Sequence, residues 1–248
     1  MYRDDVLRAL DPAEFAKSVG VTPDLWQSEV LRSEDKRILL NCCRQSGKST
    51  TCSLKALHVA LYKPKSLILL VSPSMRQSQE LFKKCKDQYL AMDDRPPLTE
   101  DNKLSMTLTN GSRIISLPGD QATVRGYSSV TMILEDEAAQ VRDEFYQAVL
   151  PMLIINNGTL ICMSTPFGVR GHFYQEWASG GPEWKKIEIT AEMCPRITTE
   201  QLEAQRRSMS ELFFAQEFMC RFIELEDTSF KYDLIQRAFS DDVLPLFQ

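Results

Sequence analysis

This 248-residue chain has few of the residues that build zinc sites and disulfide frameworks. It contains only two histidines, and its seven cysteines include no C-x-x-C pair, so we expect no zinc site and reduced cysteines in the core of a cytosolic protein. No apolar run approaches the roughly 20 residues that a membrane-spanning helix needs, and we recognise no signal peptide. These absences favour an ordinary globular protein that does not contact membranes.

Positive charge is also scarce. The chain has 29 Lys and Arg against 34 Asp and Glu, which gives a formal net charge of −5 at pH 7. That sign is wrong for a domain that binds DNA tightly by itself. Lysines cluster only at 83–86 and 185–186, and we interpret both clusters as solvated faces. Any contact with nucleic acid is therefore expected to be weak or to depend on assembly.

One segment has the pattern of a phosphate-binding loop. The run CCRQSGKST at 42–50 follows a short apolar run at 37–41 and precedes helical spacing over 49–62. This is the strand, loop and helix context that the motif requires. The loop amides would hold the β-phosphate of a nucleotide, Lys48 would reach the β- and γ-phosphates, and the Ser49 hydroxyl would bind Mg²⁺.

The loop departs from the usual pattern at one position. Cys42 stands where the first glycine is expected, so a residue with a side chain turns the strand into the loop, and that side chain penalises a positive φ. A Gly-Lys-Ser triplet alone also occurs by chance at a capped helix start. A second motif is needed to decide between the two interpretations.

That second motif is an apolar, β-branched run at 130–134 that ends in three carboxylates, Glu135, Asp136 and Glu137. Such a run is typical of a buried parallel strand that reaches the edge of its sheet. Asp136 would hold the magnesium through water, and Glu137 would polarise the attacking water. Carboxylates at a strand end are often merely solvated. Together with the phosphate loop, however, they define a P-loop ATPase of the additional-strand class with a glutamate base.

The rest of the chain alternates strands with helical crossovers and is long enough for one large domain. We predict an α/β fold, a P-loop NTPase of the additional-strand glutamate type with a mostly parallel, doubly wound sheet. Asn110-Gly111 predicts a β-hairpin, whereas 92–102 is expected to be a loop. Further strands are expected at 66–71, 158–166 and 184–189, and further helices beginning near residues 11, 22, 74, 171 and 199.

In their order and spacing these motifs resemble the large terminase subunit of tailed bacteriophages, the ATPase of the DNA-packaging motor. The resemblance covers nearly the whole chain, and phosphate loops of this family often lack the first glycine. The residues that carry it are Trp26-Gln27, the loop 44–49, Ser72-Pro73 with Gln77, and the segments 124–127, 134–139 and 163–166.

The resemblance implies a complete nucleotide site. Gln27 would read the adenine edge with Trp26 packed nearby, although a buried aromatic beside a helix cap has the same pattern. The remaining residues implied to bind ATP are Gln45, Ser46, Gly47, Lys48, Ser49 and Thr50, and those implied to bind Mg²⁺ are Ser49 and Asp136.

It also implies groups that sense or stabilise the reacting phosphate. Ser164 and Thr165 resemble the coupling motif one strand over from Glu137, although small residues also simply end strands. Arg44 resembles an arginine that in this family contacts phosphate or communicates nucleotide state. Arg142 and Arg125 are alternative fingers for a neighbouring subunit's ATP, and the sequence does not choose between them.

The implied organisation is a RecA-like ATPase core over 1–167 and, over 168–248, a lid subdomain with the start of a linker to a nuclease domain that this chain lacks. The implied partners are double-stranded DNA, the portal protein, the small terminase subunit and further copies in a ring docked on a procapsid in the host cytoplasm. The alternatives are a superfamily-two helicase-like translocase and a nucleotide-gated docking protein.

Overall fold

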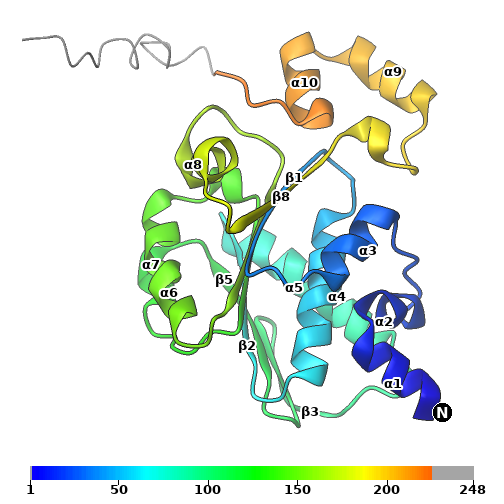
Figure 1. Cartoon of the computed structure of the whole chain (residues 1–248), viewed down its shortest axis with the longest axis vertical. Coiled ribbons are helices and arrows are strands. Elements are labelled where there is room, and N and C mark those ends of the chain that lie inside the picture. The colour runs from blue at the N-terminus through cyan, green and yellow to red at the C-terminus, as the bar shows by residue number, and fades with distance from the viewer. Residues whose placement is uncertain (1, 225–248) are drawn as a thin grey trace, which may run out of the picture.

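The strands form one eight-stranded sheet with the order β3-β4-β5-β2-β6-β7-β1-β8, and the computed structural model describes residues 2–224 (Figure 1). All pairs from β5 to β8 in this order are parallel, whereas β3 and β4 extend one edge as antiparallel strands. The strands are β1 Arg37–Cys42, β2 Leu67–Ser72, β3 Leu98–Asp101, β4 Ser105–Leu108, β5 Arg113–Pro118, β6 Met132–Asp136, β7 Thr159–Ser164 and β8 Trp184–Ile189.

Helices cover both faces of this sheet. Figure 1 shows α1 to α5 on one side and α6 to α8 on the other, with α9 and α10 beyond the end of the sheet. The helices are α1 Tyr2–Leu10, α2 Pro12–Ser18, α3 Leu25–Arg32, α4 Lys48–Tyr62, α5 Met75–Leu90, α6 Gln121–Val124, α7 Asp143–Ile154, α8 Gly171–Ser179, α9 Thr199–Ser208 and α10 Glu211–Met219; Ala138–Gln140 and Ala191–Met193 are short 3-10 helices. Among the described residues, no helix is long and apolar enough to cross a bilayer.

The core has two layers because successive side chains of a strand point to opposite faces. In β1, Ile38 and Leu40 belong to the core beneath α4, whereas Leu39 belongs to the core beneath α7. The strand β7 separates β1 from β6, so one additional strand lies between the phosphate-loop strand and the acidic strand. This topology confirms the predicted fold class. The seven cysteines are free and buried.

Two local predictions had different outcomes. The hairpin around Asn110-Gly111 is confirmed, and the Asn110 amide also donates to the carbonyls of Ala60 and Leu61 at the end of α4. The prediction of a loop over 92–102 is wrong in part, because Leu98–Asp101 forms the edge strand β3 against β4. This segment is a strand because it pairs with β4, and its own residues do not favour a strand.

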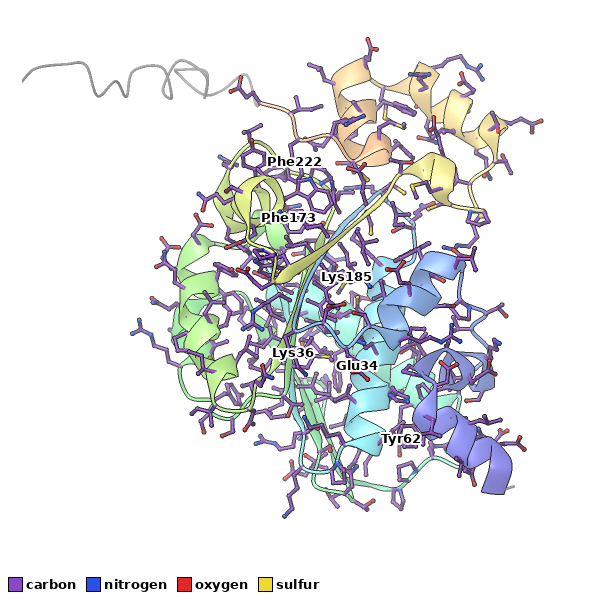
Figure 2. The ribbon with its side chains drawn as sticks, viewed as in Figure 1. Glu34, Lys36, Tyr62, Phe173, Lys185 and Phe222 are labelled. Atoms are coloured by element: carbon purple, nitrogen blue, oxygen red, sulfur yellow. The ribbon has the colours of Figure 1, made fainter. Side chains whose placement is uncertain are left out.

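The segment after residue 167 adds the strand β8 to the sheet before the chain continues into α9 and α10. β8 pairs with β1 along its full length, so the sheet extends past the predicted boundary between core and lid. Phe222 returns to this part of the molecule and packs on Phe173 of α8, with ring centroids 6.0 Å apart (Figure 2). The predicted helical content beyond α10 lies largely outside the described residues.

Candidate nucleotide-binding site

The phosphate loop runs from the end of β1 at Cys42 to the start of α4 at Lys48. The backbone cost that we expected at Cys42 does not arise there, because Cys42 is the last strand residue and pairs with Ile189 of β8. Positive φ angles fall instead on Gln45, at 59°, and on Gly47, at 92°. Gly47 tolerates this angle because it has no side chain.

Four polar side chains, two from the start of α4 and two from the end of β6, meet beside this loop. Lys48 Nζ lies 3.4 Å from Glu137 Oε1, and the Ser49 hydroxyl donates to Asp136 Oδ2 at 3.1 Å. Lys48 is buried, whereas Glu137 keeps about a quarter of its side chain exposed, at 26%. The structure therefore brings together the lysine, hydroxyl and two carboxylates that the sequence placed in separate motifs.

The charges of this group influence one another. Burial acts to lower the pKa of Lys48, but the carboxylates of Glu137 and Asp136 outweigh it and raise that pKa. Burial and the nearby Glu137 raise the pKa of Asp136, while Lys48 and Ser49 oppose the rise. The lysine thus stays charged in its buried position, as a phosphate-binding cation must.

Glu137 has an unusual backbone that directs its side chain. Its φ of 53° is left-handed, and its amide donates to Asp136 Oδ1 at 3.2 Å. The hydroxyls of Ser164 and Thr165, at the end of β7, reach Glu137 Oε2 at 3.5 and 3.4 Å. A non-glycine residue in this region is uncommon, and such strain often accompanies functional positions.

The donor set at this corner suits a magnesium ion. Ser49 Oγ and Asp136 Oδ2 already lie 3.1 Å apart, and both are oxygen atoms, which Mg²⁺ prefers over nitrogen and sulfur. Thr50 follows Ser49 inside α4, where its carbonyl accepts from Ser53 and Gln88. The structure therefore places the Ser49 hydroxyl beside Asp136, and it places the Thr50 carbonyl inside the packing of α4.

Gln27 lies against the phosphate loop and uses both ends of its amide. Its Oε1 accepts the Asp24 amide at 2.9 Å, and its Nε2 donates to the Ser46 carbonyl at 3.3 Å. An added Cβ on Gly47 would lie only 2.6 Å from Gln27 Nε2, a second reason for glycine there. Trp26 is buried in the core beside it. The adenine-reading role of Gln27 remains a prediction.

Arg196, which sequence reasoning missed, joins the segment after β8 to the same loop. Its guanidinium donates to the Ser46 carbonyl at 2.6 Å and pairs with Asp24 at 2.7 Å. No motif surrounds Arg196 in the sequence.

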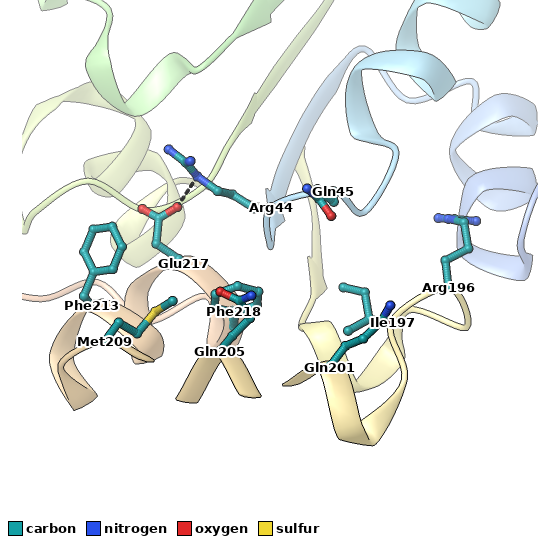
Figure 3. A pocket seen from close by; sticks show the side chains of 10 residues that line it. All are labelled: Arg44, Gln45, Arg196, Ile197, Gln201, Gln205, Met209, Phe213, Glu217 and Phe218. Atoms are coloured by element: carbon teal, nitrogen blue, oxygen red, sulfur yellow. Dashed lines mark ion pairs between the residues drawn. The ribbon is translucent and has the colours of Figure 1, made fainter. Parts of the chain in front are cut away.

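Arg44 contacts α10 rather than the carboxylates of the site. Its guanidinium forms an ion pair with Glu217, and its amide donates to the Glu217 carbonyl at 3.0 Å (Figure 3). Arg44 and Gln45 line one side of a cavity of about 400 Å³, and residues of α9 and α10 line the other. Lys48, Asp136 and Glu137 do not line this cavity, so it borders the phosphate loop on the side of α9 and α10.

The two finger candidates are both exposed. Arg142 precedes α7 and Arg125 follows α6, and neither side chain makes a hydrogen bond or an ion pair with any residue of the described part of the chain. Each is therefore free to meet another molecule. The structure does not choose between them, and both assignments remain predictions.

The strand β7 lies between β1 and β6, and a lysine and two carboxylates converge near the ends of these strands. This arrangement is that of the P-loop NTPases with an additional strand. Residues 39–237 match the family described as terminase large subunit, T4likevirus-type, N-terminal. Because this match covers most of the chain, the protein belongs to that family.

Individual relatives agree with this assignment. The chain is 25% identical over 194 residues to the terminase large subunit of Thermus phage G20c, which covers 70% of this chain and 40% of that protein. Its fold resembles the large terminase ATPase domain of Thermus phage P74-26, with a TM-score of 0.75 and 20% identity over 85% of this chain and 98% of that one. The large terminase of a thermophilic bacteriophage, solved in complex with ATP-gamma-S, is similar with a TM-score of 0.62 and 12% identity over 79% of this chain and 52% of that one.

Proposed function

We propose that this chain binds ATP with Mg²⁺ and hydrolyses it. The loop amides and Lys48 would hold the β- and γ-phosphates, and Ser49 and Asp136 would hold the ion, which shields the phosphate charge. Glu137 would orient and polarise the water that attacks the γ-phosphate. The convergence of Lys48, Ser164 and Thr165 on the Glu137 carboxylate is the observation that supports this role most directly.

The contacts of the loop with the lid helices suggest how nucleotide state would be transmitted. Arg44 pairs with Glu217, and Arg196 holds the Ser46 carbonyl, so the loop touches the segment after β8 at two points. A change in the loop on loss of the γ-phosphate would shift both contacts. The predicted roles of Gln27 and Trp26 at the base end complete this proposal.

The chain spans about 40% of the length of the curated relative from Thermus phage G20c. For the whole protein, we propose ATP-driven translocation of double-stranded DNA into a procapsid in the host cytoplasm. Its partners would be the portal protein, the small terminase subunit and further copies in a ring. The family match favours this motor over a helicase-like translocase. The negative charge suits DNA contact that forms only in the assembly.

The experiment that tests this proposal is steady-state ATP hydrolysis with Mg²⁺, recorded per chain over a wide range of protein concentration. Turnover that rises with concentration is expected if Arg142 or Arg125 completes the site of a neighbour. Measurable turnover that does not change with concentration would mean that the site is complete within one chain, and Arg44 would then take the role of the finger. No hydrolysis at any concentration would contradict the proposal that the chain hydrolyses ATP, and it would favour a nucleotide-gated docking protein.

A further inference from the structure

A second polar cluster lies on the opposite face of the sheet from the phosphate loop. It consists of Glu135 of β6, Cys162 of β7 and His172 of α8, and their ligand atoms all lie within 4.8 Å of one another. Each of the three is buried, with 0%, 0% and 3% of its surface exposed. The proposed ATP reaction uses none of these side chains.

The three side chains contact one another through a single carboxylate. The Cys162 thiol donates to Glu135 Oε2 at 3.0 Å. His172 Nε2 lies 3.2 Å from both oxygens of Glu135 but has hydrogen-bond geometry only toward Oε2. The other oxygen, Oε1, is buried and has no hydrogen-bond partner. A fully buried carboxylate oxygen that accepts no hydrogen bond is costly, and a cation bound among the three side chains would satisfy it.

We propose that Glu135, Cys162 and His172 bind one divalent ion of the zinc class. Carboxylate oxygen, thiolate sulfur and imidazole nitrogen together form a donor set that zinc accepts, whereas magnesium prefers oxygen alone. On binding, the S–H bond of Cys162 and the Nε2–H bond of His172 break, both protons leave to solvent, and one metal–thiolate and one metal–imidazole bond form. The ion would also bind Glu135 Oε1, the oxygen that accepts no hydrogen bond.

The surroundings of His172 match those of a metal ligand. Asp143 Oδ1 lies 3.3 Å from His172 Nδ1 and also accepts the His172 amide at 2.7 Å. A carboxylate on Nδ1 holds a proton on that nitrogen, so that Nε2, which faces Glu135 in this structure, would be the nitrogen that gives up its proton and binds the metal. Tyr146 stacks on the imidazole, with ring centroids 4.6 Å apart. Two residues of α7 therefore hold the ring in place.

This site would connect the catalytic strands to α8. Glu135 directly precedes Asp136, and Cys162 precedes Ser164 by two residues, so an ion here would fix the ends of β6 and β7 relative to the helix that contains His172. Our prediction from the sequence that the chain has no zinc site would then be wrong. The three ligands lie far apart in the chain, so their spacing gave no signal.

The test is the metal content of untagged, full-length protein, purified from zinc-containing medium and passed over a chelating resin. We expect about one zinc per chain by elemental analysis. Refolding the same protein with Co²⁺ should give a thiolate-to-cobalt charge-transfer band. Neither readout involves ATP, so a negative result here leaves the proposed hydrolysis untouched.

Variants assign the site. Cys162→Ala and His172→Gln should each lower bound metal at least about tenfold, and Cys162→Ala should abolish the cobalt band. Cys85→Ala, which removes another fully buried thiol, should retain both. If these variants fail to fold, the wild-type measurements still decide. The proposal is overturned by wild-type protein without stoichiometric zinc and without a cobalt band, or by Cys162→Ala that keeps its metal.

Discussion

Glu135 and Asp136 are neighbours on β6, but their carboxylates lie in opposite environments. Asp136 faces the phosphate loop, where Ser49 donates to it and Glu137 lies beside it. Glu135 points to the other face, where it is sealed beneath α8 with His172. One strand thus supports a corner with a partly exposed carboxylate beside it and a cluster that is closed to solvent. The comparison separates residues that we propose to act on a substrate from residues that we propose to hold the structure.

The largest expected effect lies on the open side. Lys48→Ala should lower ATP turnover by about 10³-fold or more, because it removes the buried cation that would neutralise the phosphate charge. Lys83→Ala is the matched control, since Lys83 is an exposed lysine paired with Asp87 on α5. Steady-state hydrolysis measures both variants, and equal turnover in the two would remove Lys48 from the site.

The closed side should respond in stability instead. His172→Ala leaves the Glu135 carboxylate buried without its partner, which should lower the free energy of unfolding by about 3–5 kcal/mol. His58→Ala is the control and should cost less, because His58 Nε2 is bonded to the neutral Arg8 carbonyl at 3.0 Å, so its removal leaves no buried charge behind. Urea denaturation measures the loss. Turnover per folded chain should stay within about twofold of the wild type, and a selective loss of turnover would refute the separation.

A pH series probes the core beside the phosphate loop. Burial raises the pKa of Cys52 in α4 from 9.0 to about 12. The unfolded chain therefore loses this thiol proton near pH 9, whereas the folded chain keeps it until about pH 12. The stability contribution is complete below pH 9 and is lost as pH rises from 9 to 12, by up to about 1.4 kcal/mol per pH unit.

Comparison with Cys52→Ala isolates this effect from other titrating groups. Lys55 opposes it, because burial lowers the pKa of Lys55 from 10.5 to about 8, so this lysine makes stability rise between pH 8 and 10.5. Both groups are present in the wild type, and only the thiol is absent from the variant. The unfolding free energy of the variant should fall less steeply above pH 9, and identical slopes would contradict the assignment.

The smallest effect is expected from the hydroxyls at the end of β7. Thr165→Ala removes one hydrogen bond to Glu137 Oε2, so turnover should fall by about 2–10-fold. Thr165→Ser keeps the hydroxyl and should restore most of the rate. Ser164→Ala should cost less turnover than Thr165→Ala, since the Ser164 hydroxyl donates to the Thr165 carbonyl at 2.6 Å and lies 3.5 Å from the same oxygen of Glu137. A loss as large as that of Lys48→Ala would mean that Thr165 contacts the reacting phosphate itself.

The two sides of β6 also differ in what could be predicted from sequence. The residues of the open corner belong to two short motifs, so spacing was enough to identify Lys48, Asp136 and Glu137 and to predict the strand between them. The contacts of Arg196 and Glu217 with the phosphate loop, and the cluster around Glu135, join segments that are distant in the chain. Tertiary packing alone brings such residues together, and no local pattern records it.

The edge strand β3 was not predicted from the sequence, for a related physical reason. Its residues follow Pro96-Pro97 and are mostly polar and exposed, which is typical of a loop. The strand forms because β4 offers unpaired backbone groups, and pairing with them satisfies the amides and carbonyls of Leu98–Asp101. Local propensity is a weak guide wherever a neighbour decides the structure.

The most direct test of the account is the behaviour of Glu137→Gln in two measurements on one preparation, equilibrium binding of ATP with Mg²⁺ and steady-state hydrolysis. The amide keeps the shape of the side chain but cannot take a proton, so we expect ATP to bind while turnover falls by about 10²–10⁴-fold. ATP binding together with wild-type turnover would contradict the assignment of Glu137 as the base.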